Sequence, residues 1–255
     1  MIGAILGDII GSRFEFNKSI KIENFDLFTK ECFFTDDTVL TIATADAILN
    51  NKSFVEAYQR WGRKYPNRGY GEMFSSWLYN NNPKPYDSFG NGSAMRVSPI
   101  GWFYNDLVAV VNKAAESAIV SHTHIEGIKG ACAVAGSIYL ARSTKNKEKV
   151  KDFIKDYIGY DLNKTIEEIK NIYSFNETCQ GSVPESIICF LEGNNYEDVI
   201  RKAISLNGDT DTMACIAGGI AEAFYGIPDN ISAKINEYLP GEMLNIVEQY
   251  KMAVL

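Results

Sequence analysis

Glycines recur at intervals of four residues in the apolar N-terminal segment, at Gly3, Gly7 and Gly11. An α-helix turns once every 3.6 residues, so this spacing places the three glycines on nearly one helix face. Glycine destabilises a helix interior by roughly 1 kcal/mol relative to alanine, so the stripe needs a packing or ligand reason. We expect tight packing against another helix. Small residues crowd two further stretches: Gly130, Cys132, Ala133, Ala135 and Gly136, and Ala214, Ala217, Gly218 and Ala221.

Helical periodicity also dominates the rest of the chain. Apolar side chains three and four residues apart, the spacing of one helix face, recur in several segments: 37–49, 106–120, 125–142, 183–192, 196–206, 211–225 and 241–253. Alternating strand patterns with two-residue turns are hard to find. Neither the Pro/Asn stretch 80–88 nor the charged stretch 143–152 is typical of a flexible domain linker. We predict an all-α chain of ten or more helices, folded as one compact domain over residues 1–255.

Charge and cysteine content limit the partners and the compartment. The 32 acidic and 25 basic residues give a net charge of −7 and a pI near 5.0, which argues against a basic nucleic-acid-binding face. Phosphates can still be held by metals or backbone N–H groups. Five cysteines without a CxxC pair indicate a reducing compartment. Because the N-terminus lacks a basic region and no apolar run approaches a membrane span, we expect a cytoplasmic, soluble monomer without membrane contact.

Two aspartate clusters stand where predicted helices begin. Residues 35–38 read Thr-Asp-Asp-Thr, and residues 208–212 read Gly-Asp-Thr-Asp-Thr. Helix capping is one explanation, because such residues satisfy free N–H groups and contribute about 0.5–2 kcal/mol each. However, apolar helix flanks both clusters, and buried acids at this density repel each other unless they protonate or bind cations. Carboxylate and hydroxyl oxygens suit Mg²⁺ or Mn²⁺, and four carboxylates can bridge two metals about 3.5–4 Å apart.

Residues 88–96 read Ser-Phe-Gly-Asn-Gly-Ser-Ala-Met-Arg. Gly90 and Gly92 free the backbone for close approach, which suits a phosphate cradle, although an ordinary turn explains the segment equally well on its own. Both histidines of the chain, His122 and His124, lie in a Ser-His-Thr-His segment. Two interpretations of this segment remain open: it contacts a ligand, or it is a polar loop or the polar start of a helix. A zinc site would need further Cys or His ligands, and a catalytic triad lacks its nucleophile elbow.

Glu15 lies between two phenylalanines, seven residues after Asp8, and shares its helix face if the first helix continues that far. One interpretation is that Glu15 simply lies on the polar side of an amphipathic surface segment. The other is that apolar neighbours raise its pKa, so that it serves as a general acid or base. The Asp-Thr-Asp-Thr segment at 209–212 also resembles the nucleophile motif of haloacid-dehalogenase phosphatases. That motif requires a preceding β-strand, whereas the segment 196–206 is predicted to be helical.

Taken in this order, the motifs resemble the ADP-ribosylglycohydrolase family, which includes the dinitrogenase reductase-activating glycohydrolase and the ADP-ribosyl-acceptor hydrolases. The paired Thr-Asp-Asp-Thr and Gly-Asp-Thr-Asp-Thr motifs are specific, and residues 145–175 match least. The matching segments are GAILGDIIGSRFEF (3–16), FTDDTVLTIATADAIL (34–49), FGNGSAMRVSPIG (89–101), GSVPESIICFLE (181–192) and NGDTDTMACIAGGIAEAFYGIP (207–228).

The resemblance implies an orthogonal helical bundle with a two-metal site, usually magnesium or manganese, at the floor of a central cleft. Glu15 matches a glutamate used near the scissile bond, and with Asp36 and Asp37 it makes up the expected catalytic group. The implied metal ligands are Thr35, Asp36, Asp37, Asp209, Asp211 and Thr212. The implied substrate contacts are Gly90, Asn91, Gly92, Ser93 and Met95 in the loop that meets the ADP-ribose phosphates and ribose, together with His122 and His124.

The implied activity is metal-dependent hydrolysis of the glycosidic bond between ADP-ribose and a protein or other acceptor, which reverses ADP-ribosylation. A non-catalytic sensor that binds ADP-ribose or a nucleotide in the same cleft is the alternative. Residues 121–180, where members differ in acceptor preference, do not identify the acceptor. The chain reads Asn207-Gly208 where Gly-Gly is frequent in the family. We expect this change to be tolerated unless the backbone there needs a positive φ.

Overall fold

The computed structural model describes residues 1–15 and 25–254, and within these ranges it is helical and has no β-strand. This confirms the all-α prediction; Phe16, the end of the first motif, lies outside the described residues. A 3₁₀ turn, η1 (Asn91–Ser93), and a π-helical segment, η2 (Phe153–Ile158), accompany the α-helices. The α-helices are α1 (Ile2–Gly11), α2 (Asp36–Leu49), α3 (Phe54–Lys64), α4 (Glu72–Tyr79), α5 (Ser98–Phe103), α6 (Leu107–Ile119), α7 (Ile125–Thr144), α8 (Lys147–Asp152), α9 (Ile166–Lys170), α10 (Cys179–Glu192), α11 (Tyr196–Ser205), α12 (Thr210–Tyr225), α13 (Asp229–Ser232), α14 (Ile235–Tyr238) and α15 (Gly241–Val254).

Every segment predicted from periodicity coincides with a helix, with small shifts at the ends. The largest shift is in α10, which begins at Cys179 rather than at residue 183. The Thr178 side chain caps this helix by accepting a hydrogen bond from the N–H of Gly181 (3.1 Å). Pro184 lies inside the same helix, although proline has no N–H to donate to the helix backbone. Residues 80–88 form a loop, as expected. No helix in the described ranges combines the length and apolar character needed to cross a lipid bilayer.

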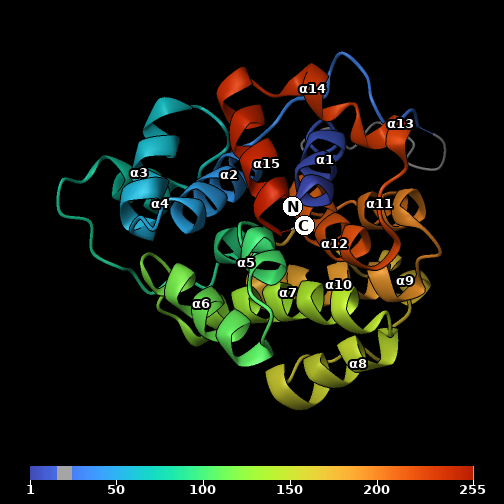
Figure 1. Cartoon of the computed structure of the whole chain (residues 1–255). Helices are drawn as coiled ribbons and strands as arrows, with labels where there is room; N and C mark the ends of the chain where they lie inside the picture. The colour runs from blue at the N-terminus through green and yellow to red at the C-terminus, as the bar shows by residue number, and fades with distance from the viewer. Residues whose placement is uncertain (16–24, 255) are drawn as a thin grey trace.

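The glycine stripe of α1 lies directly against the backbone of α12, side by side at the centre of Figure 1. A Cβ atom on Gly7 would lie 2.1 Å from the carbonyl oxygen of Ala214. Gly3 approaches Gly218 in the same way, and Gly11 approaches Thr210. The predicted tight helix packing is therefore confirmed, and the order of the contacts makes the two helices antiparallel. The C-terminal end of α1 consequently meets the N-terminal end of α12, where the second acidic motif begins.

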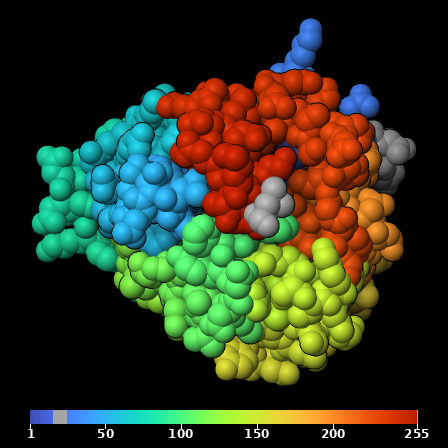
Figure 2. Space-filling model, in the orientation of Figure 1, coloured from blue at the N-terminus to red at the C-terminus, as the bar shows by residue number. Residues whose placement is uncertain are grey.

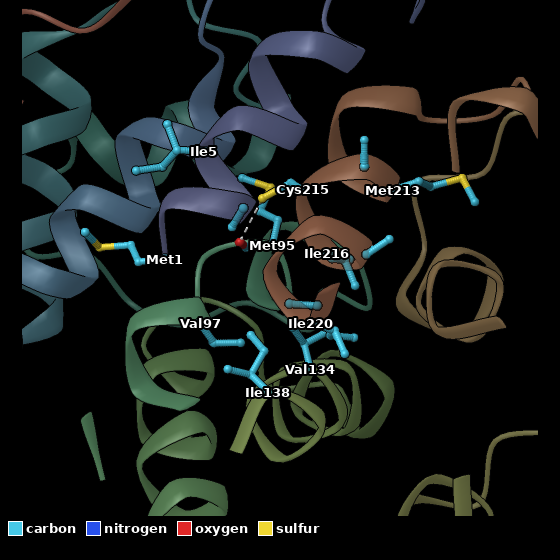
Figure 3. Packing of buried hydrophobic residues seen from close by; sticks show 14 of the residues in the cluster. Met1, Ile5, Met95, Val97, Val134, Ile138, Met213, Cys215, Ile216 and Ile220 are labelled. Carbon is cyan, nitrogen blue, oxygen red and sulfur yellow. Dashed lines mark hydrogen bonds between the residues drawn. The ribbon is translucent and has the colours of Figure 1, made fainter. Parts of the chain in front are cut away.

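Other helices enclose this pair. The N-terminal ammonium of Met1 forms a partly buried ion pair with Glu222 of α12 (2.5 Å), which ties the start of α1 to its partner. Residues 3–11 are all buried, and Figure 2 shows hardly any of α1 on its face, where the red C-terminal segments lie over the centre. The other side of α12 packs on α5 and α7, and Figure 3 shows Ile220 close to Val134 there. The two acidic motifs are thus held by the most buried part of the fold.

Candidate active site

A cleft of about 440 Å³ opens where the N-terminal ends of α2 and α12 meet the C-terminal end of α1. Its wall includes most of the residues singled out from the sequence. Three are absent from the lining: Thr35, Ser93 and His124. The predicted residues that line the cleft are Glu15, Asp36, Asp37, Gly90, Asn91, Gly92, Met95, His122, Asp209, Asp211 and Thr212. Residues separated by nearly 200 positions are therefore brought to one cavity.

Asp8 joins this site although the sequence analysis gave it no role. Its carboxylate is completely buried and accepts hydrogen bonds from the N–H groups of Thr35 (3.0 Å) and Thr38 (3.1 Å) and from both threonine hydroxyls. Asp8 thus caps α2 from a different helix. Burial raises the pKa of Asp8 to about 6, although the bonds from Thr38 and Thr35 oppose the rise. An isolated aspartate in an otherwise apolar helix was the sequence signal, since a buried acid needs partners.

Asp8, Asp37 and Asp211 form the first group of carboxylates, with one oxygen from each lying within 4.8 Å of the others. The Thr212 hydroxyl donates to Oδ2 of Asp37 (3.2 Å), but Oδ1 of Asp37 is buried without a hydrogen-bond partner. Burial raises the pKa of Asp37 well above its usual value, and the charges of Asp8 and Asp36 raise it further. Burial and the charge of Asp209 also raise the pKa of Asp211 well above its usual value. Such a group is unfavourable unless it is protonated or neutralised.

Glu15, Asp209 and Asp211 form a second group with the same 4.8 Å limit. The first helix ends at Gly11, so Glu15 does not share a helix face with Asp8; a turn closed by the N–H of Phe14 and the carbonyl of Gly11 (2.9 Å) carries it toward the cleft instead. Burial and the charge of Asp209 raise the pKa of Glu15 to about 7. The two groups share Asp211, so one continuous acidic floor runs under the cleft.

Helix capping explains only part of these motifs. The Thr35 hydroxyl accepts a hydrogen bond from the N–H of Asp37 (3.3 Å) and so caps α2. The Asp209 side chain makes no capping bond with α12 and accepts instead from the side-chain amide of Asn91 (2.7 Å). Asp36 lines the cleft, and burial together with the charge of Asp8 raises its pKa well above its usual value. Clustered carboxylate and hydroxyl oxygens with an unpartnered Asp37 oxygen suit a hard divalent cation.

The glycine loop lies on the wall beside this floor. Residues 91–93 form the 3₁₀ turn η1, and the N–H of Gly90 donates to the Ser88 hydroxyl (3.1 Å). Asn91 fixes the loop to the floor through its bond to Asp209 and to the adjacent segment before α10 through its N–H, which donates to the carbonyl of Glu177 (2.8 Å). Ser93 is fully buried, and its hydroxyl donates to the carbonyl of Gly127 (2.7 Å). The segment is a turn and also part of the cleft wall.

The two histidines occupy different environments. His122 is buried and lines the cleft. His124 caps α7 by accepting a hydrogen bond from the N–H of Glu126 (3.1 Å), so the helix-start interpretation applies to it. Its ring packs against Phe89 (5.3 Å between centroids). Phe89 lines the cleft, so His124 lies behind that side chain. Further lining residues that the sequence analysis gave no role include Tyr86, Arg96 and Glu177.

The second acidic motif depends on a left-handed residue. Asn207 has a φ of +54°, so the position does need the positive φ that glycine provides in the frequent Gly-Gly pair. Asparagine is among the residues that adopt this conformation most readily, which explains why the chain accepts it. At Gly208, a Cβ atom would lie 2.4 Å from the Tyr173 ring. The element directly before Asp209 is the helix α11, which ends at Ser205, and not the strand that the phosphatase motif requires, so the phosphatase interpretation is excluded.

Helices arranged around a carboxylate-floored cleft define the class: an all-α protein with a candidate cation site beside a glycine-containing loop. Comparison with known proteins gives the family. The family model for ADP-ribosylglycohydrolases matches residues 1–253, so this chain belongs to the ADP-ribosylglycohydrolase family.

Individual relatives agree with this assignment. The chain is similar to ADP-ribosylhydrolase ARH3 of Homo sapiens, with 27% identity over 89% of this chain and 84% of the relative. It is also similar to ADP-ribosylarginine hydrolase Tri1 of Pseudomonas putida, with 25% identity over 89% of this chain and 70% of the relative. A solved structure named ADP-ribosylglycohydrolase-related protein complex superimposes with a TM-score of 0.71 at 19% identity, covering 99% of this chain and 95% of that one. That structure supports the fold alone.

Proposed function

We propose that this chain hydrolyses the glycosidic bond that joins ADP-ribose to an acceptor and so reverses ADP-ribosylation. The observation that carries the proposal is the pair of carboxylate groups, sharing Asp211, beneath the glycine loop in one cleft. Family membership supports the same reaction class, and the names of ARH3 and Tri1 describe ADP-ribosyl hydrolases. The substrate is then an ADP-ribosylated protein or another ADP-ribose conjugate.

The residues fit divalent cations, and we infer two, Mg²⁺ or Mn²⁺. The unpartnered buried oxygen of Asp37 and the all-oxygen donor set support hard cations over zinc. Bound cations would neutralise the carboxylates and lower the pKa of a water molecule. The residues proposed to hold them are Thr35, Asp36, Asp37, Asp209, Asp211 and Thr212.

The remaining residues of the proposed site bind the ligand and move a proton. Gly90, Asn91, Gly92, Met95 and the His122 ring line the cleft, and the loop of Gly90–Met95 would contact the diphosphate and the nearby ribose together with His122. Hydrolysis breaks the bond from the anomeric carbon to the acceptor, adds hydroxide from water to that carbon, and returns a proton to the acceptor. Glu15, partly exposed at the edge of the acidic floor, takes the proton from water and delivers it to the leaving group. Asp36 and Asp37 complete the proposed catalytic group.

We also infer that the whole chain works as one domain and as a monomer. The cleft needs α1 from the start of the chain and α12 from near its end, so neither half would carry a complete site.

A release assay tests the proposal. Purified protein is incubated with ADP-ribose linked to arginine, to serine, to a nucleic-acid end and as O-acetyl-ADP-ribose, with Mg²⁺ or with a chelator. Release from at least one linkage only with Mg²⁺, reduced at least a hundredfold in Asp36→Ala and Asp211→Ala, is expected. Asp229→Ala, an exposed aspartate in the first turn of α13, is the matched control and should retain activity. Wild-type release by the Asp211→Ala protein would refute the proposal, and tight ADP-ribose binding without release from any linkage would favour the sensor.

A further inference from the structure

Three polar side chains form a chain that leads from the protein core to the cleft. The guanidinium of Arg96 is completely buried over the ring of Tyr58 (4.3 Å to the centroid). Its Nη2 donates to the Ser121 hydroxyl (2.9 Å) and to the backbone carbonyl of Ser117 (2.7 Å). The Ser121 hydroxyl lies 2.8 Å from Nδ1 of His122, whose ring lines the cleft. Ser121 itself is completely buried.

The direction of these hydrogen bonds follows from the donors and acceptors available. Arginine can only donate, so the Ser121 oxygen accepts from Arg96. The Ser121 hydroxyl has one proton, and within the described residues the only acceptor in its reach is Nδ1 of His122. If Nδ1 carried the proton instead, this buried hydroxyl would lose its acceptor, at a cost of roughly 1–3 kcal/mol. Nδ1 therefore accepts, and the ring proton sits on Nε2.

The Nε2 atom faces the glycine loop. A Cβ atom on Gly92 would lie 3.5 Å from Nε2, and one on Gly90 would lie 3.7 Å from it, so the nitrogen is adjacent to the part of the wall without side chains. Nε2 has no hydrogen-bond partner within the described part of the chain. A Cβ atom on Gly127, at the start of α7, would lie 3.0 Å from the His122 Cβ, so the helix approaches His122 closely where it carries no side chain.

The surroundings also keep the ring uncharged. Burial lowers the pKa of His122 well below its usual value, and the charge of Arg96 lowers it further. The titratable and charged groups around the ring are Tyr86, Asp87, Arg96, His124, Glu126 and Glu177. Arg96 is the one that reaches it through a continuous hydrogen-bonded path.

We propose that Arg96 and Ser121 are positioning residues that hold His122 as a neutral imidazole with its proton on Nε2, which donates to a phosphoryl oxygen of the ligand beside Gly90 and Gly92. The identity of the ligand as ADP-ribose rests on the proposed function, whereas the tautomer does not. An anionic ligand is then met by a fixed neutral donor, so this contact does not change as the pH passes through the usual pKa of histidine.

Nitrogen NMR of the metal-free protein tests the tautomer without any ligand. The chain has only two histidines, so His124→Gln leaves a single ring and assigns the signals. We expect the proton of His122 on Nε2 and no titration between about pH 5.5 and about pH 8. A proton on Nδ1, or titration near the usual histidine pKa, would overturn the proposal. In Ser121→Ala, where no hydroxyl donates to Nδ1, the ring proton should distribute over both nitrogens.

ADP-ribose binding tests the functional consequence. We expect Ser121→Ala to weaken binding about tenfold, the loss of about one oriented hydrogen bond, at pH 8 and at pH 5.5 alike, because burial and Arg96 keep the ring neutral in the variant too. The measured quantity is the ratio of the variant and wild-type Kd values by calorimetry, because this ratio cancels the titration of the acidic floor that both proteins share.

Two further variants separate positioning from damage to the fold. Ser117→Ala removes a neighbouring, completely buried hydroxyl that donates to the carbonyl of Ala114 and leaves the path to His122 intact, so its Kd ratio should stay near one at every pH. Ser121→Thr keeps the hydroxyl and should keep both the wild-type Kd and the proton on Nε2. A Kd ratio near one in Ser121→Ala, or a tenfold loss with the proton still confined to Nε2, would overturn the positioning role. If wild-type protein binds no ADP-ribose, the proposed function fails, while the NMR spectrum still decides the tautomer.

Discussion

Buried acids in this protein meet two different environments, and the difference separates structural from functional carboxylates. Asp46 of α2 is 2% exposed and receives hydrogen bonds from Nε1 of Trp61 (2.9 Å), Nδ2 of Asn50 (2.7 Å) and Nζ of Lys52 (3.1 Å). Asp37, nine residues earlier on the same helix, keeps one buried oxygen without any donor. The first acid is already satisfied by protein groups, whereas one oxygen of the second is left without a hydrogen-bond partner.

Asp46→Asn should destabilise the fold by about 2 kcal/mol at neutral pH, because the buried donors around it lose a charged acceptor. Burial alone would raise the pKa of Asp46, but the bonds from Trp61 and Lys52 lower it below its usual value. A lowered folded-state pKa gives stability that is present above the unfolded pKa and is lost as the pH falls through the folded one. Urea unfolding should therefore show a difference between variant and wild type that shrinks below about pH 4. An unchanged difference in acid would show that packing, not charge, is responsible.

Asn207 offers a test of backbone strain at one exposed residue. Its side chain makes no hydrogen bond within the described part of the chain, and its φ is +54°. Asn207→Ala should cost about 1 kcal/mol in unfolding free energy, because a Cβ without a compensating polar group is unfavourable in this conformation. Asn207→Gly should stay within about 0.5 kcal/mol of wild type, since relief of strain offsets the greater freedom of the unfolded chain. Equal losses in both variants would point to a role for the asparagine side chain instead.

At the scale of helices, the contact between α1 and α12 fixes the geometry of the acidic floor. Gly7→Ala should destabilise the protein by more than about 3 kcal/mol, because the new Cβ would lie 2.1 Å from a backbone carbonyl that cannot move independently. The control is Gly241→Ala at the start of α15, where nothing lies within 4 Å of the new Cβ. Thermal unfolding should show the control unchanged or slightly more stable. Similar melting temperatures for the two variants would contradict the packing described here.

The helices and the residues of the floor could be predicted from local patterns. Helical periodicity predicted α2, α6, α7, α11 and α12 nearly to their ends, because apolar side chains recur at helical spacing along each of them. The glycine spacing of α1 predicted a closely packed partner helix but did not identify it. Any helix with a stripe of small residues was a possible partner. Long-range pairing is set by the whole core and not by neighbours in sequence.

Individual site contacts depended on features that local patterns do not encode. Glu15 reaches the cleft through a turn after Gly11, not by continuation of the helix. His124 resembles its neighbour His122 in sequence, yet it is used as a helix cap. Asp8 was visible as a lone acid in an apolar helix, but its threonine partners are about 30 residues away. Each of these depends on where another helix lies.

At the scale of the whole molecule, the net charge of −7 includes carboxylates that the fold holds in an unfavourable state. Burial raises the pKa of Asp8 to about 6, while burial together with repulsion from neighbouring acids raises that of Glu15 to about 7 and those of Asp37 and Asp211 well above the usual range. Each raised pKa means that the charged form is less favourable in the folded protein than in the unfolded chain. A cation that binds only the folded protein would reverse this penalty.

The stability of the protein should therefore depend on pH and Mg²⁺ together. A folded-state pKa that is raised above the unfolded value gives stability that is complete below the unfolded pKa and is lost as the pH rises through the folded one. With a chelator, the melting temperature should fall between about pH 5 and about pH 8, the range set by the raised pKa values of Asp8 and Glu15. Mg²⁺ at about 100 times its Kd should restore about 2.7 kcal/mol per site, with the larger effect at pH 8, where the carboxylates are ionised.

Asp211→Asn separates this effect from a general response to salt. Asp211 belongs to both carboxylate groups, so the amide removes one repelling charge from each while keeping the shape of the side chain. In chelator at pH 8 the variant should melt above wild type, and Mg²⁺ should raise its melting temperature much less. Asp229→Asn, at an exposed helix start, should behave as wild type in both conditions. A Mg²⁺ effect that is equal at the two pH values, or that survives in Asp211→Asn, would mean that the acidic floor is not where the cation stabilises the fold.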